Sequence, residues 1–221
     1  MLRALFILAV TASCGFAAAA DDNDRGRELV DIFVNDVETF AGRFEQTLID
    51  PDGEVLESST GVLSISRPGK FRWAYEAPYE QWLVADGLNI WSYDVDLAQV
   101  TVKPQAEALA NTPALLLGGA SNAMDEFEVV ESDEEGGPTD ELGLEWVRLQ
   151  PVDADSGFAY VDLGFADDTL NRMVFLDNLQ QTTIVYLTEV TVDEPVDAAE
   201  FRFEVPDDVD VVGTPAEAST P

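Results

Sequence analysis

The amino-acid sequence predicts an α+β fold that is mainly β, built on a single antiparallel sheet of about ten strands partly covered by short helices. Two observations support this prediction. Short apolar runs alternate with Gly, Pro, Asn and Asp turn signals every 8–12 residues along most of the chain, which is typical of an antiparallel meander. Helical periodicity is confined to one segment near the N-terminus and one short apolar turn in the middle.

Residues 1–20 have the three parts of a secretory signal peptide. Arg3 supplies the positive charge, Leu5–Ala12 forms a short apolar core, and Ala17–Ala20 supplies small residues for cleavage before Asp21. The apolar core is too short to span a bilayer as a permanent helix. We therefore expect an exported protein.

The only cysteine, Cys14, lies inside this segment. It raises the alternative of a lipoprotein with an acylated N-terminus, but Thr11–Ser13 lack the branched apolar residue usual three places upstream. The favoured interpretation is a small residue removed with the signal, which leaves a mature chain without disulfides. Nothing marks an internal boundary, so we predict one domain over residues 21–212 and a flexible polar tail over residues 213–221.

The mature chain opens with a predicted amphipathic helix from Arg25 to Phe40, whose apolar residues recur on one face. Strand-like runs follow, separated by turn signals such as Pro51-Asp52-Gly53. A short helical turn is expected at Asp197–Ala199. Outside the central aromatic region, the predicted strands are Phe44–Ile49, Gly61–Ser66, Val100–Lys103, Trp146–Leu149, Tyr160–Phe165, Leu170–Leu176, Thr182–Val192 and Phe201–Val205.

The segment from Arg67 to Gln99 is distinctive because three of the four tryptophans lie in it at intervals of nine residues. In the strand after Pro68-Gly69, the rings of Phe71, Trp73 and Tyr75 share one face, since side chains alternate along a strand. Such an aromatic face either packs a solid core or lines an apolar cavity. The residues alone leave both interpretations open.

A short apolar helix is predicted after Asn111. Thr112 is a good N-cap and Pro113 a good first helical residue, and the leucines Leu115–Leu117 follow before Gly118-Gly119 ends the turn. This turn could be a core helix or a lid over the sheet.

The chain has 44 acidic residues against 11 Lys and Arg, and its net charge of -33 is spread along its whole length. Nucleic acid is excluded as a partner because phosphate binding needs clusters of Lys and Arg. Anionic membrane surfaces should repel the chain, which argues against stable membrane insertion. The favoured explanation is a solvated surface adapted to high salt, and a role in keeping the protein off membranes is the alternative. The acidic stretch Ser132–Glu141 is expected to be a loop between two strands.

The side chains needed for most catalysis are missing. The chain has no histidine, and the mature chain has no cysteine, which excludes Ser-His and Cys-His catalysis and imidazole- or thiolate-ligated metal sites. Carboxylate pairs arise by chance in so acidic a chain, and its Asp-rich turns lack the Glu at the twelfth position of a calcium loop. We predict no enzyme activity, no metal and no cofactor.

An ordered set of motifs spans the mature chain. It comprises Phe44-Glu45-Gln46, RPGKFRW at Arg67–Trp73, Pro78, LVADGLNIWSYDVDLAQV at Leu83–Val100, Asn111-Thr112-Pro113 and Val196–Phe201. In this order the set resembles the LolA family of periplasmic outer-membrane lipoprotein carriers. This chain departs from the pattern in its own residues at Gly69, Lys70 and Arg72 and in its much higher acidity.

The resemblance implies an incomplete, highly curved antiparallel barrel whose helices act as a lid over a cavity for acyl chains. It implies a monomeric periplasmic carrier that receives lipoproteins from an inner-membrane ABC transporter of the LolCDE type and delivers them to an outer-membrane receptor of the LolB type. Two alternatives remain at this point: a receptor of the same fold, which would need an acylated Cys14, and a generic periplasmic binder of hydrophobic ligands.

The resemblance also implies roles for individual residues. Arg67 matches the family's arginine and would be a lid latch, whose guanidinium donates hydrogen bonds to backbone carbonyls at the end of a lid helix. The alternative is a surface arginine that caps a turn. The expected cavity residues are Phe71, Trp73, Tyr75 and Trp91. In the following strand, Trp82 and Val84, or alternatively Leu83, are expected to extend the cavity wall. The expected lid residues are Leu115, Leu116 and Leu117. For each ring, ordinary core packing is the alternative.

Overall fold

The computed structural model describes residues 22–109, 114–118, 123–130, 143–153 and 155–217. The predicted signal peptide, the Asn111-Thr112-Pro113 motif and the acidic loop at Ser132–Glu141 lie outside the described residues. Within the described part, no helix combines the length and apolar character needed to cross a membrane.

The described residues form twelve strands in one sheet. Their bounds are β1 Thr39–Ile49, β2 Val55–Ser66, β3 Lys70–Ala77, β4 Gln81–Asp86, β5 Asn89–Asp94, β6 Gln99–Pro104, β7 Phe127–Val130, β8 Glu145–Pro151, β9 Phe158–Ala166, β10 Thr169–Asp177, β11 Thr182–Val192 and β12 Asp210–Gly213. The helices are α1 Asp22–Asp31, α2 Gln105–Leu109 and α3 Ala114–Gly118, with the shorter helical turns η1 Ile32–Asp36, η2 Ala123–Glu126 and η3 Ala198–Phe201.

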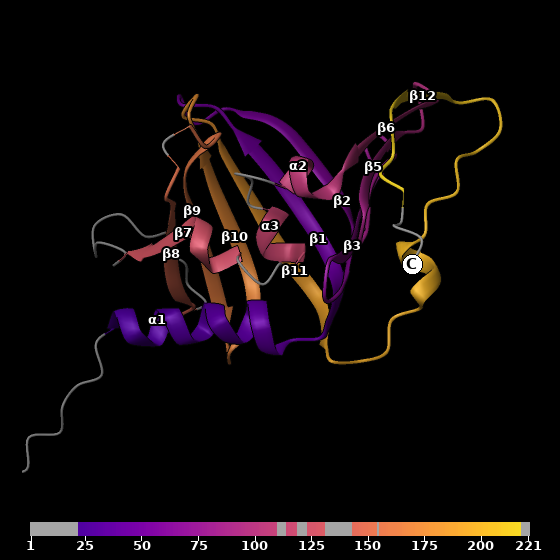
Figure 1. Ribbon diagram of the computed structural model, residues 1–221. Coiled ribbons are helices and arrows are strands. Elements are labelled where there is room, and N and C mark those ends of the chain that lie inside the picture. Colours follow the sequence, from indigo (N-terminus) through magenta and orange to yellow (C-terminus); the bar gives the residue numbers. More distant parts are fainter. Residues whose placement is uncertain (1–21, 110–113, 119–122, 131–142, 154, 218–221) are drawn as a thin grey trace, which may run out of the picture.

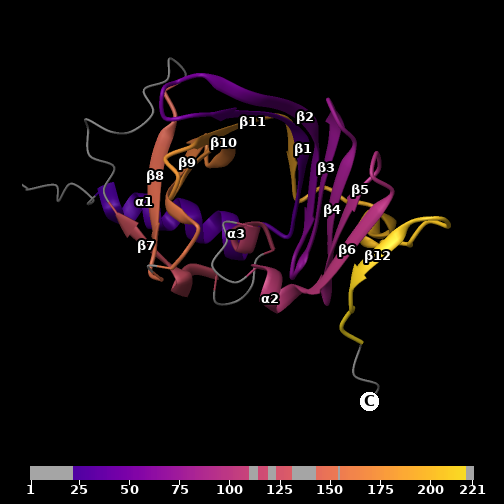
Figure 2. The same cartoon turned by 90° about the horizontal axis from the view of Figure 1, so that it is seen from above.

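The order of the strands explains the shape of the sheet. It runs β12-β6-β5-β4-β3-β2-β1-β11-β10-β9-β8-β7, so β1 joins the two halves of the chain by pairing with β2 on one side and β11 on the other. The sheet curves around an interior, and its edges β12 and β7 do not pair with each other (Figure 2). The prediction of a mainly β protein with one highly curved, unclosed sheet and short helices is confirmed, with twelve strands instead of about ten.

The helices lie at one end of the sheet and inside its curve. Helix α1 crosses the end opposite most of the hairpin tips and contacts β7 and β8 (Figure 1). Helix α3 lies in the interior and contacts β2 and β3 (Figure 2). Together with η1, these helices close the apolar interior at that end, where buried Leu29, Val30, Phe33 and Leu116 pack into the main core.

The first helix is shorter than its periodicity indicates. Its last turn is a π-helix over Ile32–Asp36, and Val37 already has an extended backbone whose N–H bonds to the carbonyl of Ile32. Phe40, predicted to lie on the helix, is a fully buried strand residue of β1 that pairs with Ile65 and Val192. An apolar residue at this position suits either element, and pairing on both sides of β1 decides for the strand.

The C-terminal region departs most from the prediction. The strand predicted over Phe201–Val205 is not formed, since Phe201 ends the helical turn η3 and residues 202–206 have no regular structure. The unpredicted strand β12 instead pairs with β6 in the sheet's only described parallel contact. Gly213, where a flexible tail was expected to begin, ends this strand. Beyond it, Ala216 exchanges two hydrogen bonds with the side chain of Asn89.

Candidate functional site

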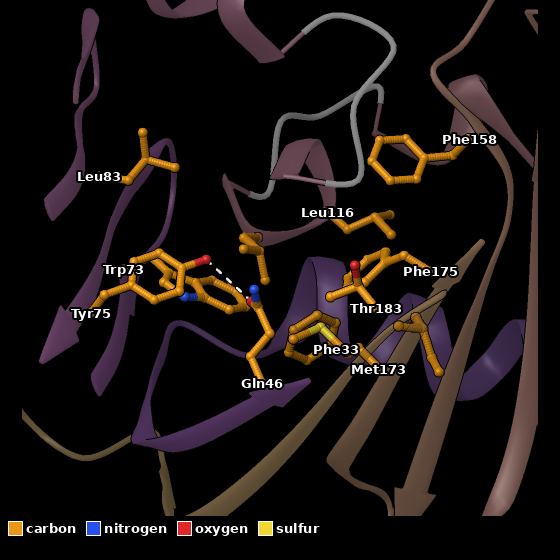
Figure 3. Close-up of a pocket in the computed structure, with 12 residues that line it drawn as sticks. Phe33, Gln46, Trp73, Tyr75, Leu83, Leu116, Phe158, Met173, Phe175 and Thr183 are labelled. Atoms are coloured by element: carbon orange, nitrogen blue, oxygen red, sulfur yellow. Dashed lines mark hydrogen bonds between the residues drawn. The ribbon is translucent and has the colours of Figure 1, made fainter. Parts of the chain in front are cut away.

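An apolar cavity of about 320 Å³ lies inside the curve of the sheet, between its two halves and helix α3 (Figure 3). Its lining comes from both halves of the chain and from the helices. The lining residues are Phe33, Gln46, Trp73, Tyr75, Leu83, Leu116, Leu117, Phe158, Leu163, Met173, Phe175 and Thr183.

Strand alternation and pairing register place one wall of this cavity. Trp73 and Tyr75 are two residues apart on β3 and therefore point to the same face. Leu83 of β4 is directly opposite Trp73 in the ladder, so its side chain points to that face too. These three residues, all expected at the cavity, are brought together there.

An aromatic cluster supports this wall from β1. The ring of Phe44 lies 4.9 Å from that of Trp73 and 5.2 Å from that of Tyr75, the latter edge to face. A Cβ at Gly61 would clash with the Phe44 ring, at 2.8 Å, and with the carbonyl oxygen of Ala74. The glycine in β2 therefore allows the cluster to pack directly on the sheet.

Phe71 is placed differently from its neighbours on β3. It shares their face but is fully buried in the core cluster, and it is not part of the cavity lining. Phe71 was expected to line the cavity, but it packs in the core beside it.

Trp82 and Trp91 do not extend the cavity wall. Register pairs Trp82 with Tyr93 and Val84 with Trp91, and all four side chains lie on the outer face of the sheet. There the guanidinium of Arg72 lies 4.5 Å from the centre of the Trp82 ring, and Trp91 stacks on Phe203 at 5.4 Å. The prediction was wrong for both tryptophans because the pairing register, which the sequence does not show, places them on the face opposite Trp73. Of the two alternatives on β4, it is Leu83 that points inward.

Helix α3 closes one side of the cavity. Leu116 and Leu117 are buried and line it, whereas the side chain of Leu115 lies outside the described part of the chain. The N–H of Gly69 donates to the carbonyl of Gly118 at 2.7 Å, which ties the turn between β2 and β3 to the end of this helix.

Arg67 occupies the junction of this turn, the N-terminal helical segment and α3. Its guanidinium donates to the carbonyl oxygens of Val37 and Leu116, each at 3.2 Å, and lies 4.8 Å from the centre of the Phe33 ring. Its Nε is buried without a hydrogen-bond partner among the described residues. Burial lowers the pKa of Arg67 to about 10, so the group is still charged at neutral pH.

Two polar side chains interrupt the apolar wall. The hydroxyl of Tyr75 donates to Oε1 of Gln46 at 3.2 Å (Figure 3). Burial raises the pKa of Tyr75, so its phenol stays protonated at neutral pH. Both residues also line a second cavity of about 420 Å³, which is more polar than the first.

Several lining residues were not predicted from the sequence. Phe158, Met173 and Phe175 come from β9 and β10 in the second half of the chain. Their strands were foreseen, but only the pairing of β1 with β11 brings those strands opposite β3. Gln46 had a usable signal, since it belongs to the Phe44-Glu45-Gln46 motif.

The described residues hold no group of three or more Asp, Glu, His or Cys side chains arranged to bind a metal ion. What the site offers chemically is a partly open apolar volume bounded by a helix, which the described residues tie to the sheet through the Arg67 and Gly69 hydrogen bonds.

Comparison with known proteins identifies the family. The family profile described as outer membrane lipoprotein carrier protein LolA matches residues 35–204. The chain belongs to the LolA family. The match begins at the end of the N-terminal helical segment (residues 22–36) and ends within the C-terminal segment (residues 198–217), part of which contacts the outer face of the sheet. It thus includes every strand that contributes to the cavity.

Relatives within this LolA family match the chain nearly end to end. An outer-membrane lipoprotein carrier protein of Bordetella pertussis is 39% identical over 210 residues, covering 95% of this chain and 97% of the relative. Proteins of the same name from Hahella chejuensis (39% identity, 96% of this chain and 97% of the relative) and Pseudomonas aeruginosa (35%, 96% and 98%) match similarly.

Proposed function

We propose that this protein is a periplasmic carrier that binds the acyl chains of lipoproteins in its interior cavity and moves them between membranes. The observation that carries the proposal is the apolar cavity beneath α3, in a chain whose relatives along its whole length are named outer-membrane lipoprotein carrier proteins. The role is binding and release, without catalysis, cofactor or metal.

The size of the cavity indicates which state the structure represents. A volume of about 320 Å³ is near the lower end for drug-sized ligands, and three long acyl chains need more space. Burying those chains is worth on the order of 30 kcal/mol at ~0.8 kcal/mol per methylene, which is ample to drive a rearrangement. We therefore interpret the structure as a closed conformation, in which α3 and its leucines move aside when cargo enters.

Arg67 is the proposed lid latch of this closed state. Its hydrogen bonds join the carbonyl of Leu116 on α3 to that of Val37 at the end of the N-terminal helical segment. A guanidinium suits this role because its N–H donors point in fixed directions in one plane and can reach two separate carbonyl oxygens. When α3 moves, the bond to Leu116 must break, so the latch opposes premature opening.

Replacing Arg67 with leucine should release the lid. In Arg67→Leu we expect faster amide hydrogen exchange in α3 and incomplete transfer of bound lipoprotein to the receptor, because the closed state no longer favours cargo release. Arg202→Leu is the matched control, since Arg202 is exposed and outside the cavity. Unchanged exchange and unchanged transfer in Arg67→Leu would show that Arg67 only caps a turn.

The partners follow from this role. The carrier, acting as a monomer, would accept lipoproteins from a LolCDE-type transporter in the inner membrane and pass them to a LolB-type receptor in the outer membrane. Nucleic acid is not a partner, and the carrier does not insert stably into membranes. The acidity of the chain supports both exclusions.

Native mass spectrometry of the protein isolated from its host tests the proposal. A co-purifying lipoprotein on a mature chain with an unmodified N-terminus at Asp21 is the expected result. A diacylated Cys14 would instead identify a membrane-anchored receptor of the same fold, and a free lipid in place of lipoprotein would identify a generic binder of hydrophobic ligands.

A further inference from the structure

One wall of the apolar cavity carries polar groups that storage of plain hydrocarbon does not need. Gln46 projects from β1, and Trp73 and Tyr75 project from β3 beside it (Figure 3). The remaining lining residues are apolar except for Thr183. Hydrogen-bonding capacity is therefore concentrated at one place in the cavity.

The indole N–H of Trp73 is a buried donor that forms no well-aligned hydrogen bond with a described residue. Trp73 is 7% exposed, and its indole interacts with the nearby hydroxyl of Tyr75 without reaching the geometry of a hydrogen bond. Leaving such a donor unpaired is unfavourable, and a phenylalanine would provide a similar apolar surface without that cost. The indole N–H is thus available to an acceptor that enters the cavity.

The amide of Gln46 offers a second donor on the same wall. Its Oε1 accepts the hydroxyl of Tyr75, which turns the other end of the amide away from the phenol. No hydrogen bond of its Nε2 to any described residue is formed. Tyr75 is therefore a positioning residue, because it determines which way the Gln46 amide points.

These donors lie at a boundary between two different spaces. Gln46 and Tyr75 line both the apolar cavity and the second cavity of about 420 Å³. The second cavity has a polar and acidic lining, which consists of Gln46, Glu57, Ser59, Tyr75, Pro78, Tyr79, Gln81, Asp94, Asp96 and Leu97. An amphiphile with its hydrocarbon in the first cavity and its head in the second would place its linking group beside the donors.

We propose that Trp73 Nε1 and Gln46 Nε2 donate hydrogen bonds to the carbonyl oxygen of an acyl ester, and that Tyr75 orients Gln46 for this contact. The polar head of the cargo, the glyceryl-cysteine with the first residues of the polypeptide, then occupies the second cavity. This inference rests on the proposed carrier function and adds to it a means of positioning the cargo along the cavity, since hydrocarbon burial alone has no preferred depth.

Matched lipopeptides test the carbonyl contact on the mature full-length chain. One carries two ester-linked acyl chains, and the other carries ether-linked alkyl chains of the same length and lacks the carbonyls. We expect the wild-type protein to bind the ester form about tenfold more tightly, and Gln46→Met or Trp73→Phe to reduce that preference about threefold each. Affinity for the ether form should change little in Gln46→Met. Tyr93→Phe, on the outer face, is the control and should keep the wild-type preference.

A spectroscopic readout separates hydrogen bonding from packing. With ¹³C-labelled ester carbonyls, the bound lipopeptide should show a carbonyl stretch shifted to lower wavenumber in the wild type and shifted back in Gln46→Met. Tyr75→Phe should broaden the band, because the amide loses its fixed orientation. Near-wild-type circular dichroism establishes that these variants are folded.

The binding results distinguish failure of the carbonyl contact from failure of the carrier function. Equal affinity of the wild type for ester and ether forms, or an unshifted carbonyl band, would overturn the inference while leaving the carrier function intact. Failure to bind either lipopeptide would overturn the proposed function itself. A diacyl phosphatidylcholine serves as a third ligand: weaker binding than the lipopeptide supports the second cavity as the site of the peptide head, and equal binding contradicts it.

Discussion

The two faces of strands β3–β5 carry similar numbers of large aromatic rings, but one face borders a cavity and the other is covered by side chains. On the inner face, Trp73 and Leu83 border an open volume. On the outer face, Trp82 and Trp91 are in contact with other side chains, including Phe203 from the C-terminal segment. A high density of aromatic residues therefore predicts burial, and the covering element decides whether that burial leaves space for a ligand.

The covering elements differ in how they are held. The C-terminal segment packs on the outer face through buried Phe201 and through a hydrogen bond from Ser64 to Glu200 at 2.7 Å, and β12 adds strand pairing. Helix α3 has one turn, is hydrogen-bonded through the Arg67 and Gly69 contacts and buries Leu116 and Leu117 against the core. The outer cover is thus joined to the sheet by strand pairing, whereas the proposed lid has no strand pairing among the described residues.

The largest effect is expected when the same charge is placed on each face of the sheet. Leu83→Asp puts a carboxylate in the apolar cavity, and we expect lipopeptide affinity to fall at least 100-fold, since an unpaired charge there is strongly disfavoured. Trp82→Asp, one residue earlier on the outer face, should leave affinity within about twofold. Titration calorimetry with a diacylated lipopeptide measures both.

Folding must be checked for this pair, because the outer variant loses the ring contact with Tyr93 and the Arg72 contact. Circular dichroism melting serves that purpose. If Trp82→Asp is folded and binds as poorly as Leu83→Asp, the division of roles between the two faces is wrong.

Crowding the inner aromatic cluster should destabilise the protein more than truncating a single side chain on the outer face. In Gly61→Ala, the new methyl group clashes with the Phe44 ring and with a backbone carbonyl oxygen of β3, and we expect a loss of about 3 kcal/mol in unfolding free energy. Urea unfolding provides the measurement. Gly157→Ala is the control, because a Cβ there meets nothing within 4 Å, and a similar loss in both variants would refute the explanation.

Truncating a ring on the outer face should affect stability alone. Phe203→Ala removes the stack on Trp91 and the contact with Tyr93, and we expect about 1–2 kcal/mol of destabilisation for this half-buried ring. Lipopeptide affinity should remain at the wild-type value at temperatures where the variant is folded. A clear loss of affinity would mean that the outer cluster communicates with the cavity.

The smallest effect is expected at the end of the C-terminal segment. Asn89→Ala removes two hydrogen bonds to the backbone of Ala216 and should cost about 1 kcal/mol. Faster amide exchange at Ala216 with no change in β5 would agree with this. Unchanged exchange at Ala216 would contradict it.

The general architecture and five of the twelve cavity-lining residues could be predicted from the sequence. Regular turn signals indicated an antiparallel sheet, and alternation within one strand correctly grouped Trp73 with Tyr75. Trp82 and Trp91 were misplaced because orientation between strands depends on pairing register, and the turns between β3, β4 and β5 do not reveal it in the sequence.

Long-range pairing accounts for the remaining differences. The contribution of Phe158, Met173 and Phe175 to the cavity requires β1 to bridge the two halves, a contact between residues more than a hundred positions apart. Strand β12 was missed for the same reason: its short run, Asp210–Gly213, becomes a strand only by pairing with the free edge of β6.

The hydrogen bonding of Arg67 determines how much work opening requires. Its guanidinium is charged, largely withdrawn from water and bonded to two carbonyls at 3.2 Å. Within the described ranges, Nε has no hydrogen-bond partner and no carboxylate forms an ion pair with Arg67. The proposed opening would return this cation to solvent, and the recovered hydration would offset the lost bonds. The proposed closed state would then be a shallow free-energy minimum, which the weak interactions of a partner suffice to shift.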